Sequence, residues 1–173
     1  LELPESGERL TRERFEALHA SPEPRLVLIH TNPNEVVDAV IAAPLVAIAS
    51  DGVMSHPRGV GTHARVLARY VRDQKTITLS DAIRKMSLMP AQRLEKAVPD
   101  AKRIGRLQQG ARADIVVFDP QAIQDHASFR APTQASEGVR YLVVAGTVVV
   151  EDGRIVEGVG PGQALVRSIG SSQ

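Results

Sequence analysis

The stretch LVAIASDGVMSHPR, residues 45–58, sets the expected fold of this chain. It opens with an apolar run, residues 45–49, of the length and composition of a strand buried on both faces. The run stops at Asp51, so this acid would stand at the C-terminal end of a buried strand, where α/β proteins place their chemistry. A loop with His56 and Arg58 follows. The residues alone leave two interpretations open: a site built around Asp51, or a solvated loop acid with two ordinary polar neighbours.

Composition narrows the class of protein. The chain has 173 residues, 43% hydrophobic and 24% charged, which suits one globular domain or two small ones. A net charge of +1 and an aromatic content of 3% give no basis for nucleic-acid binding. The absence of Cys excludes disulfides, thiol catalysis and thiolate metal sites within this sequence. No apolar run approaches the ~20 residues of a membrane span and no signal peptide precedes the first helix, so we expect a cytoplasmic protein. Because the chain starts with Leu rather than Met, we expect it to be incomplete.

The first half of the chain predicts helices that alternate with two short strands. Capping residues indicate helix starts at Thr11, Asn34, Thr62 and Thr78. Apolar runs at 25–30 and 45–49 indicate strands. One short helix separates these strands, so we predict adjacent parallel strands joined by a right-handed crossover. His30 and Asp51 would then meet at one sheet edge, although His30 can equally be the start of a loop.

The helix expected after Thr62 carries both apolar and basic residues. Its inward stripe is predicted to comprise His63, Val66, Leu67, Tyr70 and Val71. Its arginines at positions 65, 69 and 72 are predicted to face mostly outward, as a solvated surface and not as a binding patch.

The last third of the chain predicts antiparallel strands. The run ADIVVFD at 113–119 reads as a strand, and residues 121–138 read as a loop. Strands at 139–144 and 147–150 are separated by Ala145-Gly146, and Asp152-Gly153 marks a second hairpin turn before 154–156. We therefore predict a division near residue 100, with one part at 1–100 and another at 101–173.

Two groups of motifs resemble the amidohydrolase superfamily. GRL at 105–107, the glycine at 110 and ADIVVFD at 113–119 are similar to the stretch where these enzymes pass from their barrel to a small β-sandwich. The hairpin sequence at 139–156 resembles the sandwich strands that follow. The upstream motifs resemble the N-acyl-D-amino-acid deacylase branch of the superfamily. They are ASDG, HPR, GT, RVL and YVR between residues 49 and 72, and LSDAIRKMSLMPAQRL at 79–94. The SDG–HPR–GT combination is much narrower than ADIVVFD, which the whole superfamily shares.

The resemblance implies the C-terminal portion of a metal-dependent hydrolase of N-acyl-D-amino acids or related amides. Its fold class is α/β plus β: residues 1–100 would hold the last two strands and helices of a TIM-type barrel, and 101–173 the strands of a small β-sandwich. In that family the acid matching Asp51 closes the last barrel strand, touches the metal centre and handles the proton of the attacking water. Arg58, with His56, would hold the substrate's carboxylate. His63 departs from the pattern, which has an aromatic residue there.

The same resemblance implies that much of the metal site lies elsewhere. A divalent ion, expected to be zinc, would take Asp51 as one ligand and most other ligands from outside this chain. The family's His-x-His pair has no counterpart among the five histidines, and a barrel needs eight strands in about 250 residues. The expected partners are an N-acyl amino acid and either the missing N-terminal barrel part or another copy of the chain, with no nucleic acid or membrane.

Two alternatives stay open. One is a non-catalytic fold remnant or assembly module, because unpaired strand edges invite association. The other is a cyclic-amide hydrolase of the same superfamily.

Overall fold

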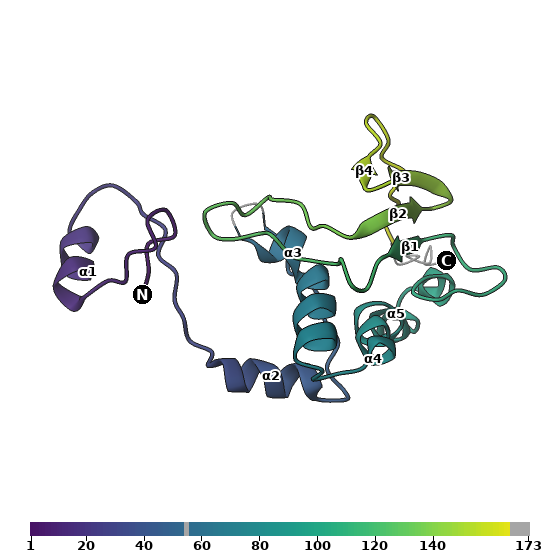
Figure 1. The fold of residues 1–173 in the computed structure, drawn as a ribbon, viewed down its shortest axis with the longest axis horizontal. Coiled ribbons are helices and arrows are strands. Elements are labelled where there is room, and N and C mark those ends of the chain that lie inside the picture. The colour runs from purple at the N-terminus through teal and green to yellow at the C-terminus, as the bar shows by residue number, and fades with distance from the viewer. Residues whose placement is uncertain (54–55, 167–173) are drawn as a thin grey trace, which may run out of the picture.

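The computed structural model describes residues 1–53 and 56–166, and it places a group of helices beside a small antiparallel sheet (Figure 1). The helices are α1 (Arg12–His19), α2 (Asn34–Ala42), α3 (Arg58–Arg65), α4 (Leu79–Ile83) and α5 (Met89–Leu94). A π-helical stretch at Val66–Asp73 continues α3, a second at Arg84–Leu88 joins α4 to α5, and a 3-10 helix follows at Pro99–Arg103. The strands are β1 (Ile115–Phe118), β2 (Val139–Val144), β3 (Thr147–Glu151) and β4 (Arg154–Ile155). Residues 54 and 55 of the stretch 45–58 lie outside the described residues.

Side-chain caps explain where two of the five α-helices begin; α2 starts at Asn34 after Pro33, without the predicted cap by the Asn34 side chain. Thr11 Oγ1 accepts the backbone N–H of Arg14 at 3.2 Å, which confirms the predicted start of α1. Thr78 Oγ1 accepts the backbone N–H of Asp81 at 3.1 Å and donates to its carboxylate at 2.7 Å, which confirms the start of α4. By contrast, α3 begins at Arg58 and not at Thr62. Pro57 precedes it with a φ of −59°, a value that the proline ring favours and a helix start accepts.

The predicted pair of parallel strands is wrong for this structure. Residues 25–30 contribute only an isolated bridge between Leu28 and Glu2, and residues 45–49 form no strand. The backbone N–H of Ile48 instead donates to the carbonyl of Lys85 at 3.0 Å. Leu45 is 90% exposed, so this run does not lie in a two-sided sheet. A parallel strand is stable only between hydrogen-bonding neighbours, and within the described residues these runs have none beyond that bridge.

The C-terminal sheet confirms the hairpin predictions. Its four strands follow the order β1-β2-β3-β4, and every neighbouring pair is antiparallel. Ala145 and Gly146, with φ of 48° and 83°, form the turn between β2 and β3. Asp152 and Gly153, with φ of 47° and 78°, form the next turn. Positive φ at both central residues suits the right-handed twist of the flanking strands, which is why Gly occupies the second position of each turn.

The core joins the helices to the segment after β1. Its buried residues are Ile48, Ala64, Val66, Leu67, Tyr70, Ala82 and Ile123. The predicted inward stripe is thereby confirmed at Val66, Leu67 and Tyr70, but His63 is exposed and does not belong to it. The division at residue 100 stays a prediction, and Ile123 from its C-terminal side shares this core.

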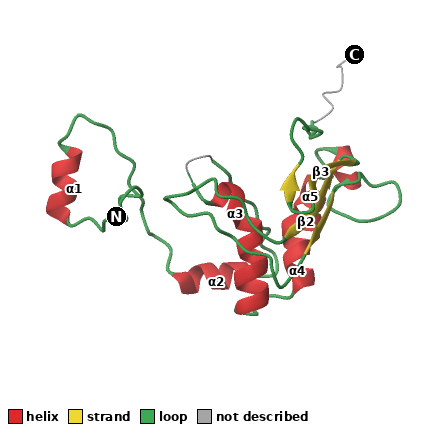
Figure 2. Cartoon of the chain, turned by 45° about the horizontal axis from the view of Figure 1, so that its top comes forward, coloured by secondary structure: helices red, strands yellow, loops and turns green. Residues whose placement is uncertain are grey.

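The N-terminal segment stands apart from the core in both views. Figures 1 and 2 show α1 set away from the other helices and joined to α2 by an extended segment. The long connection between β1 and β2 returns to the start of α3 (Figure 1). There Ser136 Oγ donates to the carbonyl of Val60 at 3.2 Å. None of the described helices has both the length and the apolar character of a membrane-spanning segment.

Candidate active site

Asp51 occupies a sharp bend after the apolar run. Its φ of 46° lies in the left-handed region, which Asp tolerates better than most residues. A Cβ on the next residue, Gly52, would stand 3.1 Å from the Cα of Gly59, so a side chain there would crowd the returning backbone. The carboxylate itself is 84% exposed. The bend therefore presents Asp51 outward, beside the start of α3.

The three predicted site residues lie close together in the structure: Asp51, His56 and Arg58. Arg58 Nη2 lies 2.9 Å from Asp51 Oδ2, and Arg58 Nε donates to the backbone carbonyl of Asp51 at 2.7 Å. The backbone N–H of Arg58 donates to His56 Nδ1 at 3.1 Å. One guanidinium thus holds both the side chain and the backbone of Asp51, while His56 caps the first residue of α3.

The surroundings of His56 disfavour protonation of its ring. Partial burial lowers the pKa of the His56 imidazole, and the positive charges of Arg58 and Arg65 lower it further. A neutral ring is also required by its hydrogen bond, because Nδ1 accepts the N–H of Arg58 only while unprotonated. On its other side the ring meets Phe129 edge to face, with ring centroids 4.9 Å apart.

Lys85 fixes the segment that leads to Asp51, and the sequence pattern did not single it out. It is 2% exposed, and its ammonium donates to the carbonyls of Ile41 at 2.9 Å, Val46 at 3.3 Å and Ala43. Two of these carbonyls belong to the end of α2 and the residue after it, where a cation also meets the negative end of the helix dipole. The three ammonium hydrogens are therefore all used to hold residues 41–46.

The predicted meeting of His30 and Asp51 is wrong. His30 Nε2 lies 3.1 Å from Glu2 Oε2, in the N-terminal segment. The predicted proximity of His30 and Asp51 required a pair of parallel strands, and these strands do not form. His30 therefore has no structural basis for a place in the site.

A cavity of about 290 Å³ adjoins Arg58. Its lining includes His56, Arg58, Thr62, Arg65, Ser128 and Phe129. Ser128 and Phe129 come from the connection between β1 and β2, which we predicted only as a loop. The signal available in the sequence was a phenylalanine in a polar stretch of a chain with few aromatic residues.

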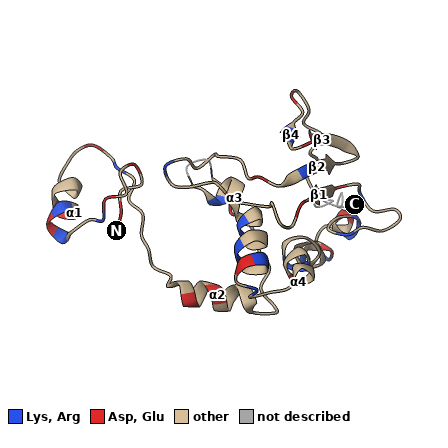
Figure 3. Cartoon of the chain, in the orientation of Figure 1, with Lys and Arg blue, Asp and Glu red and all other residues tan. Residues whose placement is uncertain are grey.

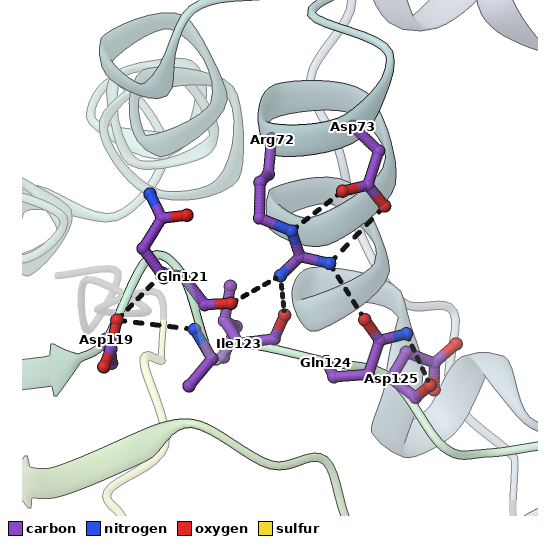
Figure 4. A network of polar contacts seen from close by, with 8 residues as sticks. Arg72, Asp73, Asp119, Gln121, Ile123, Gln124 and Asp125 are labelled. Atoms are coloured by element: carbon purple, nitrogen blue, oxygen red, sulfur yellow. Dashed lines mark hydrogen bonds and ion pairs between the residues drawn. The ribbon is translucent and has the colours of Figure 1, made fainter.

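Two arginines of the helix continuing from α3 fasten this connection. Figure 3 shows the basic residues along this helix, and Arg65 and Arg72 lie seven positions apart, on one face. Arg65 Nε lies 2.7 Å from Asp125 Oδ2, and the Asp125 side chain is only 4% exposed. Arg72 reaches the carbonyl of Ile123 at 2.6 Å and Gln124 Oε1 at 3.0 Å (Figure 4). Arg65 faces mostly outward, as predicted, with its side chain 52% exposed. Arg72 is only 23% exposed and contacts a segment distant in sequence, so the prediction of a solvated position is wrong for Arg72.

Asp51 does not form a metal site with its described neighbours. Across residues 1–53 and 56–166, no three His, Cys, Asp or Glu side chains come together in a group that could hold a metal ion. A single exposed carboxylate is not enough, because protein zinc sites use three or four ligands. The described part of the chain therefore fits a metal only with ligands from elsewhere.

Comparisons with known proteins agree with this arrangement of motifs. A model of the amidohydrolase family matches residues 11–150. The N-acyl-D-glutamate deacylase of Alcaligenes xylosoxydans xylosoxydans is 42% identical over 106 residues, which are 59% of this chain and 21% of that protein. The N-acyl-D-aspartate deacylase of the same organism is 38% identical over 133 residues, 75% of this chain and 26% of that protein. The chain thus spans about a quarter or less of the length of these relatives.

Solved structures show the same partial coverage. A D-aminoacylase described with a binuclear metal center is 34% identical, with a TM-score of 0.65 over 72% of this chain and 26% of its own. The N-acyl-D-glutamate deacylase of Bordetella bronchiseptica, complexed with zinc and a phosphonate inhibitor, is 37% identical, with a TM-score of 0.64 over 77% of this chain and 27% of its own. About three quarters of this chain thus superposes on about a quarter of these larger proteins. This chain belongs to the amidohydrolase family.

Proposed function

We propose that this chain is the C-terminal portion of a metal-dependent deacylase that hydrolyses the amide bond of N-acyl-D-amino acids. The observation that carries the proposal is the contact between Asp51 and Arg58, whose side chains lie 2.9 Å apart, in a chain of this family; Arg58 also lines a cavity. Relatives named as deacylases of N-acyl-D-glutamate and N-acyl-D-aspartate support the substrate class. The cyclic-amide alternative has no such support.

In this proposal Asp51 is the catalytic residue that moves the proton. It accepts a proton from the attacking water and passes it to the leaving amine. Its exposed carboxylate and the bend that presents it outward suit a group that must meet substrate. Arg58 Nη2, 2.9 Å from Asp51 Oδ2, holds the carboxylate in place beside the cavity.

Arg58 and His56 are proposed to bind the substrate's carboxylate. A guanidinium presents parallel N–H donors that match a carboxylate at two points. The hydrogen bond from Arg58 N–H to His56 Nδ1 leaves the other ring nitrogen of a neutral imidazole as an N–H donor. Both side chains line the same cavity, so they can act on one carboxylate.

The metal belongs to this proposal only in the complete protein. The solved relatives contain zinc or a binuclear metal center, and Asp51 would be one ligand among several. We place the remaining ligands outside this chain, because its described residues offer no group of three.

We also infer that residues 25–30 and 45–49 become strands of a TIM-type barrel beside the remaining barrel strands. Leu26, Ile29 and Leu45 support this inference, because they are 57%, 68% and 90% exposed, whereas strands of a parallel sheet bury such apolar side chains. The same exposure favours a second candidate, a non-catalytic assembly module whose partner covers these residues.

Activity separates the two candidates. The complete protein, loaded with Zn²⁺, is assayed with N-acetyl-D-leucine, N-acetyl-L-leucine and a hydantoin. The deacylase proposal expects hydrolysis of the D-amino acid derivative alone, lost on chelation. An assembly module would hydrolyse none of them, and preferred turnover of the hydantoin would favour the cyclic-amide reading.

A further inference from the structure

The wall of the cavity opposite α3 is built by residues 125–129, which have no part in the proposed chemistry. Phe129 lines the cavity and also packs edge to face against His56 at 4.9 Å. It is one of three phenylalanines in the chain, and it is the one aromatic residue of the connection that carries it. An aromatic side chain in such a position is a candidate contact for an apolar part of a ligand.

The position of Arg58 indicates which part of the substrate would reach Phe129. This step rests on the function proposed above, in which Arg58 holds the substrate's carboxylate. The carboxylate and the side chain of an amino acid leave the same carbon atom. With the carboxylate held at Arg58 and the amide directed to Asp51, which lies outside the cavity lining, the side chain is the group left to enter the cavity that Arg58 shares with Phe129.

The charges around the cavity are already balanced. Arg65 is its second guanidinium, and Asp125 neutralises it at 2.7 Å with a carboxylate that is only 4% exposed. His56 Nδ1 accepts the backbone N–H of Arg58 at 3.1 Å, an arrangement that only an unprotonated Nδ1 allows, and burial and the nearby arginines lower the pKa of the ring. Arg58 pairs with Asp51, but that carboxylate is 84% exposed and lies outside the lining, so Arg58 can still meet the substrate's carboxylate. The described lining presents no further unbalanced positive charge to a second carboxylate. A substrate with an uncharged side chain fits this balance better than an acidic one.

The wall is held firmly enough to select by shape. Besides its ion pair with Arg65, Asp125 accepts the backbone N–H of Ala127 at 2.9 Å. A Cβ on Gly61 of α3 would collide with the Asp125 carboxylate, so the two segments meet with no space to spare. Arg72 fixes the residues just before Asp125 (Figure 4).

We propose that this cavity binds the uncharged side chain of an N-acyl-D-amino acid, with Phe129 as the specificity-determining contact and Asp125 as the residue that positions the wall and balances Arg65. Phe129 then contributes through the substrate's side chain and not through the amide bond. Its removal should act on selectivity and KM more than on kcat for small substrates.

The experiment compares substrates within each variant of the complete protein. kcat/KM is measured for N-acetyl-D-leucine, N-acetyl-D-alanine and N-acetyl-D-glutamate. A ratio between two substrates is independent of the folded fraction of a variant, so a partly unfolded protein still gives a valid answer. Phe129→Ala should lower the leucine-to-alanine ratio about tenfold, mostly through KM.

Phe15→Ala is the matched control. Phe15 is also half-buried and also lies beside a histidine ring, with centroids 5.9 Å apart, but it belongs to α1, away from the cavity. It should leave the ratio unchanged. An unchanged ratio in Phe129→Ala, or a wild-type protein that prefers glutamate to leucine, would overturn the proposal.

Asp125→Asn tests the charge balance separately. Asn keeps the size of the side chain and an acceptor for Ala127, but it leaves Arg65 without its counter-charge. The glutamate-to-leucine ratio should therefore rise, about tenfold or more, which a purely structural role of Asp125 would not produce. A ratio equal to that of the wild type would overturn the role given to Asp125.

A binding measurement distinguishes failure of this inference from failure of the proposed function. If the wild type hydrolyses no N-acyl-D-amino acid, the deacylase proposal fails. The cavity is then tested by following the ring signals of His56 in NMR spectra while N-acetyl-D-leucine is added. Shifts that saturate in the wild type and weaken in Phe129→Ala support the binding site, and their absence in the wild type overturns it.

Discussion

Replacing Lys85 with Met should destabilise the chain more than any other single change on the same helix surface. Lys85 is 2% exposed, and its ammonium donates to the backbone carbonyls of Ile41, Ala43 and Val46. Met retains the length and the apolar stem but supplies no donor. The three carbonyls would then lose the donor that they share, and residues 41–46, which precede Asp51 in the sequence, would lose the side chain that holds them.

The magnitude follows from two opposing effects. A hydrogen bond to a charged group contributes about 1.5–3 kcal/mol, and a carbonyl left without a partner when buried costs about 1–3 kcal/mol. The carbonyl of Ala43 would keep the backbone N–H of Val46 at 3.3 Å, and the residues that carry the three carbonyls are half-buried, so the full penalty does not apply. Removing the buried charge recovers part of the desolvation cost, and burial does lower the pKa of Lys85. We therefore expect a net loss of about 2–4 kcal/mol in the free energy of unfolding.

Arg84→Met is the matched control, because Arg84 is the next residue and its Nη2 also donates to a backbone carbonyl, that of Pro44 at 3.2 Å. That hydrogen bond is exposed, so its loss should cost less than about 1 kcal/mol. Urea unfolding followed by circular dichroism gives both values. If Lys85→Met differs from Arg84→Met by less than about 0.5 kcal/mol, the carbonyl cluster is not a stabilising element.

Three further predictions concern the candidate site. The 173-residue chain alone, with Zn²⁺ added, should show no turnover of N-acyl-D-amino acids, because one carboxylate does not hold a catalytic metal. Metal-dependent hydrolysis above background would contradict this prediction. In the complete protein, Arg58→Lys should chiefly raise KM, since it keeps the charge but loses the two-point contact, and a fall in kcat at unchanged KM would contradict the binding role. His56 has a pKa below its usual 6.5 in the folded chain, so the unfolded chain takes up its proton first and stability should fall as the pH drops below about 6.5. His56→Asn keeps an acceptor for the N–H of Arg58 without titrating, and melting curves at pH 7.5 and 5 should show a smaller loss in that variant.

Elements that depend on nearby residues could be predicted from the sequence. The caps at Thr11 and Thr78 each act on the third residue that follows, so the starts of α1 and α4 were predictable. The turns at 145–146 and 152–153 require positive φ, and Gly at each second position signalled it. The grouping of Asp51 with His56 and Arg58 was also predictable, because the three lie within one short stretch.

Features that depend on distant partners could not be predicted. Whether 25–30 and 45–49 become strands is decided by neighbouring strands, and apolar composition cannot supply these. The pairing of Arg65 with Asp125 joins residues sixty positions apart, and an isolated arginine on a helix looks the same whether it meets solvent or a buried carboxylate. The burial of Lys85 was hidden for the same reason, since its partners are backbone carbonyls and leave no pattern in the sequence.

The central claim is that Asp51 is the base of an N-acyl-D-amino-acid deacylase, and Asp51→Asn in the complete protein tests it most directly. Asn keeps the size of the side chain and can still accept a hydrogen bond from Arg58, so the fold should be unchanged by circular dichroism. General acid–base catalysis contributes about 10²–10⁴-fold, so kcat for N-acetyl-D-leucine should fall by at least about a hundredfold. A kcat within a few-fold of the wild type would show that Asp51 is an ordinary loop acid.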